Sequence, residues 1–185
     1  LFYFLMRIIS GKYGGRRIHP PTNMPYTRPT TDIAKEGLFN ILHTRVSIED
    51  ANTLDLFGGT GCISYELASR GATHLTIVEK DGAMADFIKK NVDMLKIENV
   101  QLLRMDVFQF LNTCNNQYDV IFAGPPYALN TIDDLPKIIV QRRLIAPEGF
   151  FVLEHTPRNN YEKFEGFQFS RNYGSTIFSF FQCIE

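Results

Sequence analysis

From residue 49 onward, short apolar runs alternate with amphipathic segments. The runs predict strands at Asn52–Phe57, His74–Glu79, Val100–Met105, Tyr118–Ala123 and Gly149–His155. The segments between them predict helices at Thr60–Arg70, Gly82–Leu95, Val107–Thr113 and Ile132–Arg143. Regular alternation of strand and helix is typical of a parallel sheet with helices on both faces. We therefore expect an α/β fold of the Rossmann-like kind.

The two ends of the chain depart from this alternation. Gln168–Tyr173 and Thr176–Cys183 flank a glycine turn and predict a C-terminal antiparallel hairpin. We expect the phenylalanines of this hairpin and of the strand before it to lie in the sheet core, namely Phe150, Phe151, Phe178, Phe180 and Phe181. At the other end, the glycines between Arg7 and Pro21 predict a hairpin or a flexible arm. The prolines that follow keep the chain extended as far as a helix that starts at Thr30-Thr31-Asp32.

This first helix is expected to end near Leu42 and to bury one side, formed by Ile33, Leu38, Ile41 and Leu42. The expected organisation is a basic arm and helix over residues 1–45, packed on a core of residues 46–185. The 185 residues fit a single domain.

Composition narrows the class of protein. No apolar run approaches the roughly 20 residues that cross a bilayer. The three cysteines form no CxxC pair, which favours a reducing cytoplasm without disulfides or structural zinc. The four histidines are scattered, so no metal site is expected. We expect a cytoplasmic protein that acts as a monomer.

The charge is unevenly distributed along the chain. Residues 1–31 hold five basic residues and no acid, while the remainder holds 14 basic and 20 acidic residues (19 minus 5, and 20). A basic arm on an acidic body indicates a polyanionic partner such as RNA. The alternative is a solvated tail with no partner. The candidate RNA-binding residues are Arg7, Lys12, Arg16, Arg17 and Arg28.

A glycine-rich segment, Asp55-Leu-Phe-Gly-Gly-Thr-Gly61, follows the first strand of the alternating region. Glycines allow the backbone to approach a ligand closely, and the next helix offers unpaired N–H groups. Glu79 closes the next strand, 20 residues after Gly59, where an acid can accept hydrogen bonds from ribose hydroxyls. Together these features predict a nucleoside-type cofactor. The expected binding residues are Asp55, Phe57, Gly59, Gly61, Glu79, Lys80, Asp106 and Val107.

Two aspartates indicate which cofactor this is. Asp55 would repel the pyrophosphate of NAD but attract the ammonium and sulfonium groups of S-adenosylmethionine. Asp106, after the third strand, can accept from an adenine amino group or cap the helix that follows. We therefore expect S-adenosylmethionine.

A second candidate site follows the fourth strand, at Gly124-Pro125-Pro126-Tyr127. Two prolines fix the backbone and remove two donors, so that carbonyl groups remain as acceptors. Tyr127 offers a flat face on which a base can stack. A rigid, acceptor-rich turn beside an aromatic ring suits the exocyclic amine of a nucleobase, although a packed Pro-Pro turn is the simpler alternative.

In combination, these motifs resemble the RsmD-type family of bacterial small-subunit rRNA guanine-N2 methyltransferases. The resemblance runs from Arg7 to about Cys183. It is carried by Arg7-Ile-Ile-Ser-Gly11, Gly15-Arg-Arg17, Arg28-Pro-Thr-Thr-Asp32, Leu38-Phe-Asn40, Asp55–Gly61, Ser69-Arg-Gly-Ala72, Glu79, Asp106 and Pro125-Pro-Tyr127. It implies a seven-stranded class I methyltransferase sheet and methyl transfer from S-adenosylmethionine to the N2 of a guanine in 16S rRNA. Naked rRNA and the assembling small subunit both remain open as partners.

The chain departs from this family at two positions. Glycine stands at position 58, where the family usually has alanine, and Gly124 stands where the family has an aspartate that is expected to hold the target amine. The second difference predicts a slow enzyme that Gly124→Asp would accelerate about tenfold or more. The alternative is a catalytically impaired RNA-binding protein on a methyltransferase scaffold, and an NAD-dependent oxidoreductase is a third interpretation.

Overall fold

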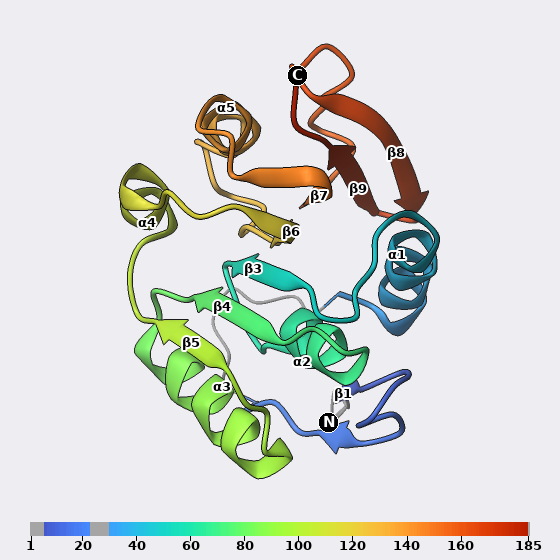
Figure 1. Cartoon of the computed structure of the whole chain (residues 1–185), viewed down its shortest axis with the longest axis vertical. Helices are drawn as coiled ribbons and strands as arrows, with labels where there is room; N and C mark the ends of the chain where they lie inside the picture. Colours follow the sequence, from blue (N-terminus) through green and yellow to red (C-terminus); the bar gives the residue numbers. More distant parts are fainter. Residues whose placement is uncertain (1–5, 23–29, 185) are drawn as a thin grey trace.

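The computed structural model describes residues 6–22 and 30–184, and its centre is a seven-stranded sheet (Figure 1). The strands are β3 (Asn52–Leu56), β4 (His74–Val78), β5 (Val100–Leu103), β6 (Tyr118–Ala123), β7 (Ile145–His155), β8 (Phe167–Tyr173) and β9 (Thr176–Phe181). Their order across the sheet is β5-β4-β3-β6-β7-β9-β8. The first five in this order are parallel, and β9 and β8 are antiparallel. The predicted α/β fold with a C-terminal hairpin is thus confirmed.

The strand order reverses direction at the centre of the sheet. From β3 the chain moves to β4 and β5 on one side, and β6 and β7 then add on the other side. Such a reversal leaves a crevice beyond the carboxyl ends of the central strands, which is where open α/β sheets bind ligands. Both motifs singled out in the sequence follow strands that border this point, β3 and β6.

Five helices cover the sheet in the described ranges: α1 (Asp32–Arg45), α2 (Cys62–Ser69), α3 (Gly82–Leu95), α4 (Val107–Thr113) and α5 (Asp134–Gln141). Apolar residues of α1 and α2 share one core cluster with Val120, Phe150 and Phe178 of the sheet. Those of α4 and α5 share a second cluster that includes Ile121 and Phe151. Because successive residues of a strand point to opposite faces, the two clusters lie on the two faces of the sheet. The phenylalanines of β7 and β9 are core residues, as expected.

Several boundaries differ from the prediction because of local backbone geometry. The strand that was expected to reach Phe57 ends at Leu56, because Phe57 adopts a left-handed conformation (φ 62°). The following helix begins at Cys62 rather than Thr60, because Gly61 (φ 80°) occupies its left-handed N-cap. The left-handed residues form the turn that carries the chain from β3 into α2.

The first helix was predicted less well than the sheet. It continues to Arg45, three residues beyond the expected end, and it is capped by Thr31, whose side chain accepts from the Ala34 amide. Ile33 does not belong to the buried side, since it is 75% exposed. Instead the buried side includes Lys35, which is 2% exposed and lies beside Glu66 of α2.

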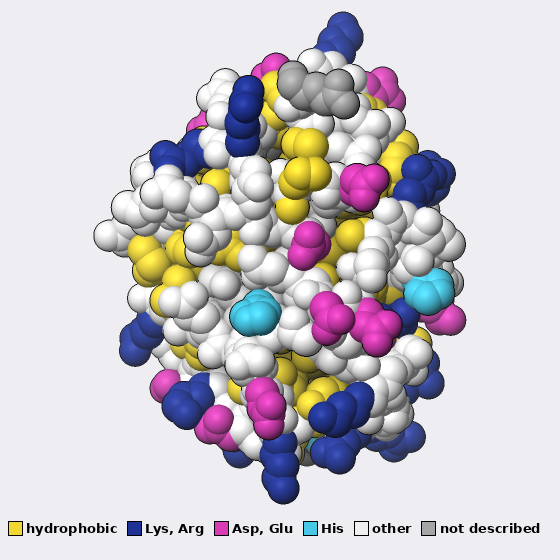
Figure 2. Space-filling model, viewed as in Figure 1, with side chains coloured by type: hydrophobic (Ala, Val, Ile, Leu, Met, Phe, Trp, Pro, Cys, Tyr) yellow, Lys and Arg dark blue, Asp and Glu magenta, His cyan; other side chains and the backbone are white. Residues whose placement is uncertain are grey.

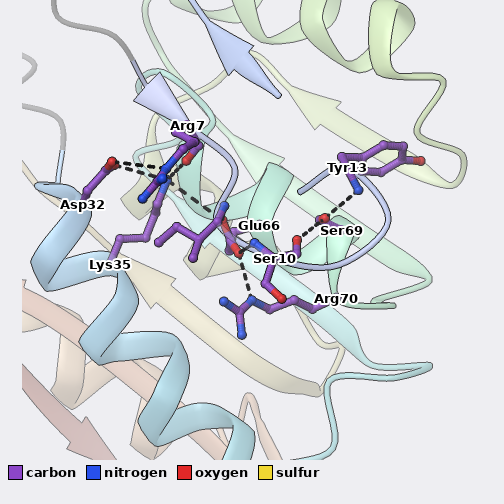
Figure 3. Close-up of polar contacts among 9 residues, drawn as sticks. Arg7, Ser10, Tyr13, Asp32, Lys35, Glu66, Ser69 and Arg70 are labelled. Carbon is purple, nitrogen blue, oxygen red and sulfur yellow. Dashed lines mark hydrogen bonds and ion pairs between the residues drawn. The ribbon is translucent and has the colours of Figure 1, made fainter. Parts of the chain in front are cut away.

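The N-terminal segment forms a docked hairpin of β1 (Met6–Arg7) and β2 (Arg17–Ile18). Its anchor is Glu66, a fully buried carboxylate on α2 (Figure 3). The amides of Ile9 and Ser10 donate to Glu66 over 2.8 and 3.0 Å, and Arg70 donates from its Nε over 2.9 Å. The amide of Tyr13 donates to the Ser69 hydroxyl over 2.9 Å. These bonds fix the position of the hairpin against α2, so the hairpin alternative was the right one for this segment.

Among the helices of the described ranges, none has both the length and the apolar character needed to span a bilayer.

Candidate active site

A cavity of about 770 Å³ opens at the carboxyl ends of β3, β4 and β6. Its lining includes the predicted cofactor residues Asp55, Phe57, Gly59, Glu79, Lys80, Asp106 and Val107. It also includes the whole predicted base-binding turn, Gly124 to Tyr127. The two sites inferred separately from the sequence therefore share one cavity. Gly61 follows the lining residue Thr60 in the chain but is not itself part of the lining.

Glu79 organises the glycine loop from the neighbouring strand. Its Oε2 accepts from the Gly59 amide and its Oε1 from the Asp81 amide, both over 2.7 Å. A carboxylate has about four acceptor sites, so these two bonds are compatible with further bonds to a ligand. Glu79 thus shapes the loop as well as being the predicted ribose-binding residue, and the sequence indicated only the second role.

Gly61 has a structural reason to be glycine. Its φ of 80° disfavours any side chain, and a Cβ there would overlap the ring of Tyr65. The Tyr65 ring packs against this point of the loop, so Gly61 sets the start of α2. Its expected contact with the cofactor stays a prediction.

Asp55 is a buried acid at the end of β3. It accepts a hydrogen bond from the Ser64 hydroxyl over 2.6 Å, which explains why serine stands where a dinucleotide fingerprint has its third glycine. Burial raises the pKa of Asp55 from 3.8 to about 7, opposed by the Ser64 hydrogen bond and helped by the nearby charge of Glu79. A cationic ligand bound beside this carboxyl would favour its ionised form.

Asp106 caps the helix that follows it. Its Oδ1 accepts from the Phe108 and Gln109 amides over 2.9 and 3.2 Å, and its Oδ2 lies 3.5 Å from the ammonium of Lys80. The capping alternative is therefore correct. Because Asp106 also lines the cavity, a contact with adenine stays open as a second role.

The Pro-Pro-Tyr turn forms the opposite side of the cavity. Gly124 donates to the Leu56 carbonyl over 3.3 Å, which joins this turn to the end of β3. Its φ lies outside the left-handed region, so the backbone itself would accept another residue. A Cβ at Gly124 would however lie 3.1 Å from the Cε1 of Phe122, a tight contact. Tyr127 is 41% exposed, so its ring is accessible at the rim of the cavity.

The polar residues of this cavity that sequence reasoning did not assign to the site include Thr30, Asp81, Arg104 and Glu154. The Thr30 hydroxyl donates to Glu154 Oε2 over 2.7 Å, and Glu154 is 6% exposed. The only sequence signal for Glu154 was an acid near the end of the apolar strand 149–155, whereas Thr30 was singled out only as part of a helix start and a family motif. Cys62, also in the lining, has a pKa raised to about 11, chiefly by burial, and is therefore not a reactive thiol.

Comparison with known proteins identifies the family. A family model described as Conserved hypothetical protein 95 matches residues 6–182. Ribosomal RNA small subunit methyltransferase D of Escherichia coli K12 is 31% identical over 154 residues, which is 83% of this chain and 76% of that protein. The protein of the same name from Haemophilus influenzae is 33% identical over 153 residues, covering 80% and 78%. The chain belongs to this methyltransferase family.

Solved structures share the fold of this chain. A hypothetical protein of Thermus thermophilus superposes with a TM-score of 0.83 at 26% identity, covering 96% of this chain and 99% of that one. The T. thermophilus 16S rRNA N2 G1207 methyltransferase, solved with AdoMet and guanosine, gives a TM-score of 0.76 at 24% identity. It covers 98% of this chain and 50% of that one, and at this identity it supports the fold alone.

In this member of the methyltransferase D family, the predicted RNA-binding residues are mostly on the docked hairpin. Lys12, Arg16 and Arg17 are exposed there, while the Nε of Arg7 lies 3.7 Å from Asp32. Arg28 lies outside the described residues. Figure 2 shows several Lys and Arg side chains at the lower edge of the molecule, over the region where Figure 1 places the hairpin and α3.

Proposed function

We propose that the protein transfers a methyl group from S-adenosylmethionine to the exocyclic N2 of a guanine in 16S rRNA. The observation that carries this proposal is the shared cavity, which holds the acid-lined glycine loop on one side and the Pro-Pro-Tyr turn on the other. Transfer between two bound groups requires both in one enclosed space. Family membership supports the same chemistry.

The cavity residues suit S-adenosylmethionine better than NAD. Asp55, with its raised pKa, gains a countercharge from a cationic ligand, whereas a pyrophosphate would meet Asp55, Glu79 and Asp106 in the same lining. We assign Glu79 to the ribose hydroxyls and Asp106 to the adenine end. When bound, S-adenosylmethionine supplies a methyl group activated by a positively charged sulfur. No metal is needed for this reaction, because the electrophile is already activated.

On the opposite side, the prolines hold the turn rigid and Tyr127 offers a stacking face for an extruded base. The hairpin's exposed basic residues, Lys12, Arg16 and Arg17, contact the RNA phosphates in this proposal. The substrate is 16S rRNA, free or in the assembling small subunit, and the protein acts as a monomer in the bacterial cytoplasm, where these subunits assemble.

The alternative of an impaired RNA-binding protein rests on Gly124 alone. The test is incubation with labelled S-adenosylmethionine and small subunits from a strain that lacks the endogenous enzyme. Label in 16S rRNA supports the proposed reaction. Tight binding of RNA and cofactor without any transfer favours the alternative, and NAD binding with no S-adenosylmethionine binding contradicts both.

A further inference from the structure

The side of the cavity that faces the target base contains one acid whose role no sequence motif assigns, Glu154. It is the residue after Leu153, which pairs with Ala123 in the parallel register of β6 and β7. Position 154 therefore lies beside Gly124 at the carboxyl edge of the sheet. An ideal Cβ on Gly124 would lie 3.8 Å from Glu154 Oε2. The carboxylate of Glu154 thus borders the space that a side chain at position 124 would enter.

The remaining acids of the cavity lining belong to the other side. Asp55, Glu79, Asp81 and Asp106 belong to β3 or follow β4 and β5, around the glycine loop. Glu154, on β7, is the acid in the lining that neighbours the Pro-Pro-Tyr turn. If the first group surrounds the cofactor, Glu154 is the carboxylate on the side of the base.

Thr30 fixes the orientation of this carboxylate. Its hydroxyl donates to Glu154 Oε2 over 2.7 Å, and it directly precedes Thr31, the N-cap of α1. The start of a capped helix is a well-defined position, so the donor is held in place. A carboxylate accepts about four hydrogen bonds, and the bond from Thr30 is compatible with others from a bound base.

The chemistry of guanine suits such an acceptor. Its Watson–Crick edge presents two adjacent donors, N1–H and the N2 amine, and a carboxylate can accept from both. Adenine presents an acceptor at N1, which a carboxylate would repel. A carboxylate that accepts from the amine also stabilises positive charge as it develops on that nitrogen. Both selection of guanine and activation of its amine follow from one side chain.

We propose that Glu154, positioned by Thr30, accepts the hydrogen bond from the N2 amine of the target guanine and takes the place of the side chain that Gly124 lacks. This inference rests on the proposed function. It assigns to Glu154 a base-binding role and to Thr30 a positioning role. It also accounts for how an N2 methyltransferase can work with glycine at position 124.

The first test compares guanosine with inosine, which lacks the 2-amino group. Both nucleosides are titrated by NMR into protein saturated with S-adenosylhomocysteine, for the parent, Glu154→Gln and Thr30→Val. The parent should prefer guanosine, and Glu154→Gln should lose this preference by on the order of tenfold to hundredfold, the range for a hydrogen bond to a charged group. Thr30→Val should lose part of it.

The second test is the single-turnover methylation rate on undermethylated small subunits, which should fall by a similar factor in Glu154→Gln. Glu162→Gln removes the same charge at an exposed position outside the cavity and should match the parent in both tests. Affinity for S-adenosylhomocysteine should be unchanged in every variant. The melting temperature should fall by no more than a few degrees in Glu154→Gln and Thr30→Val, which alter one part-buried hydrogen bond.

Glu154→Gln with the parent's guanosine preference and rate overturns the proposal. The proposal is also overturned if the rate falls only as far as a loss of cofactor affinity or of thermal stability explains. Glu154 would then have a structural role. If the parent itself binds no cofactor and methylates nothing, the proposed function is what fails.

Discussion

Replacing Asp55 with asparagine should stabilise the protein, and the gain should grow with pH. The folded pKa of about 7 lies above the ordinary value of 3.8, because burial disfavours the anion. The folded state therefore holds this proton more tightly than the unfolded state does. This tighter proton binding contributes its full stabilisation below pH 3.8, and the stabilisation is lost as pH rises towards 7. The Ser64 hydroxyl can donate to asparagine as well, so the variant should keep its local packing.

The size of the effect follows from the shift. From 3.8 to about 7 is roughly 3 pH units, and each is worth about 1.36 kcal/mol, so the full loss is about 4 kcal/mol. The stabilisation that the parent loses between about pH 5 and pH 7 corresponds to roughly two pH units, or about 3 kcal/mol. For a chain of this length, about 1 kcal/mol shifts the melting temperature by roughly 2–4 °C. The difference in melting temperature between Asp55→Asn and the parent should therefore increase by roughly 6–12 °C between about pH 5 and pH 8.

The assay is thermal unfolding of both proteins, without cofactor, across this pH range. Asp86→Asn, which changes an exposed acid on α3, serves as the control and should track the parent at every pH. A constant difference between Asp55→Asn and the parent would show that Asp55 is ionised in the folded protein already at the acidic end of the range. That result would contradict the raised pKa of Asp55.

Three further variants test other parts of the cavity and the hairpin. Glu79→Ala should weaken S-adenosylmethionine binding by roughly 1.5–3 kcal/mol in calorimetry, because it removes a charged acceptor and releases the glycine loop; an unchanged affinity would contradict its assignment. The double variant Arg16→Ala, Arg17→Ala should reduce the salt dependence of RNA binding by up to about two phosphate contacts and leave cofactor affinity alone; an unchanged salt slope would exclude these residues from the RNA contact. Gly124→Asp should accelerate single-turnover methylation by less than about tenfold, in contrast to the expectation from sequence alone, because the new carboxylate would extend from a Cβ that lies 3.8 Å from Glu154 Oε2, and two neighbouring carboxylates repel each other. The same substitution should speed the Glu154→Gln variant more than it speeds the parent, and the reverse order would argue against a single-carboxylate site.

Two helices begin and end at the predicted residues, because the sequence contains a clear signal for the start of each. Gly82–Leu95 begins after the capping residue Asp81, and Val107–Thr113 begins after the cap Asp106. The strand β7, in contrast, begins at Ile145, four residues before the predicted Gly149. Residues 145–148 include a proline and the left-handed Glu148, so they have the pattern of a turn, and only pairing with β6 makes them part of a strand.

The same distinction separates the parts of the site that the sequence predicts from those it does not. The glycine loop and Pro-Pro-Tyr turn are contiguous motifs, and their positions after strands place them at one edge of a parallel sheet. Glu154 and Thr30 are separated by 124 residues. Thr30 lies in the motif Arg28-Pro-Thr-Thr-Asp32, but Glu154 belongs to no motif, and nothing in the sequence connects the two. They meet only because β7 pairs with β6 and α1 packs against the sheet. A single acid in an apolar strand gives no sign of such a neighbour.

The central claim is that this cavity methylates the N2 of a guanine, and the product reports on it most directly. Small subunits from a strain without the endogenous enzyme are incubated with the purified protein and S-adenosylmethionine, and the 16S rRNA is then digested to nucleosides for mass spectrometry. We expect one new N2-methylguanosine per subunit, absent when Tyr127 and Glu79 are both replaced by alanine. A methyl group on any other base or atom, or none despite bound cofactor, would contradict the claim.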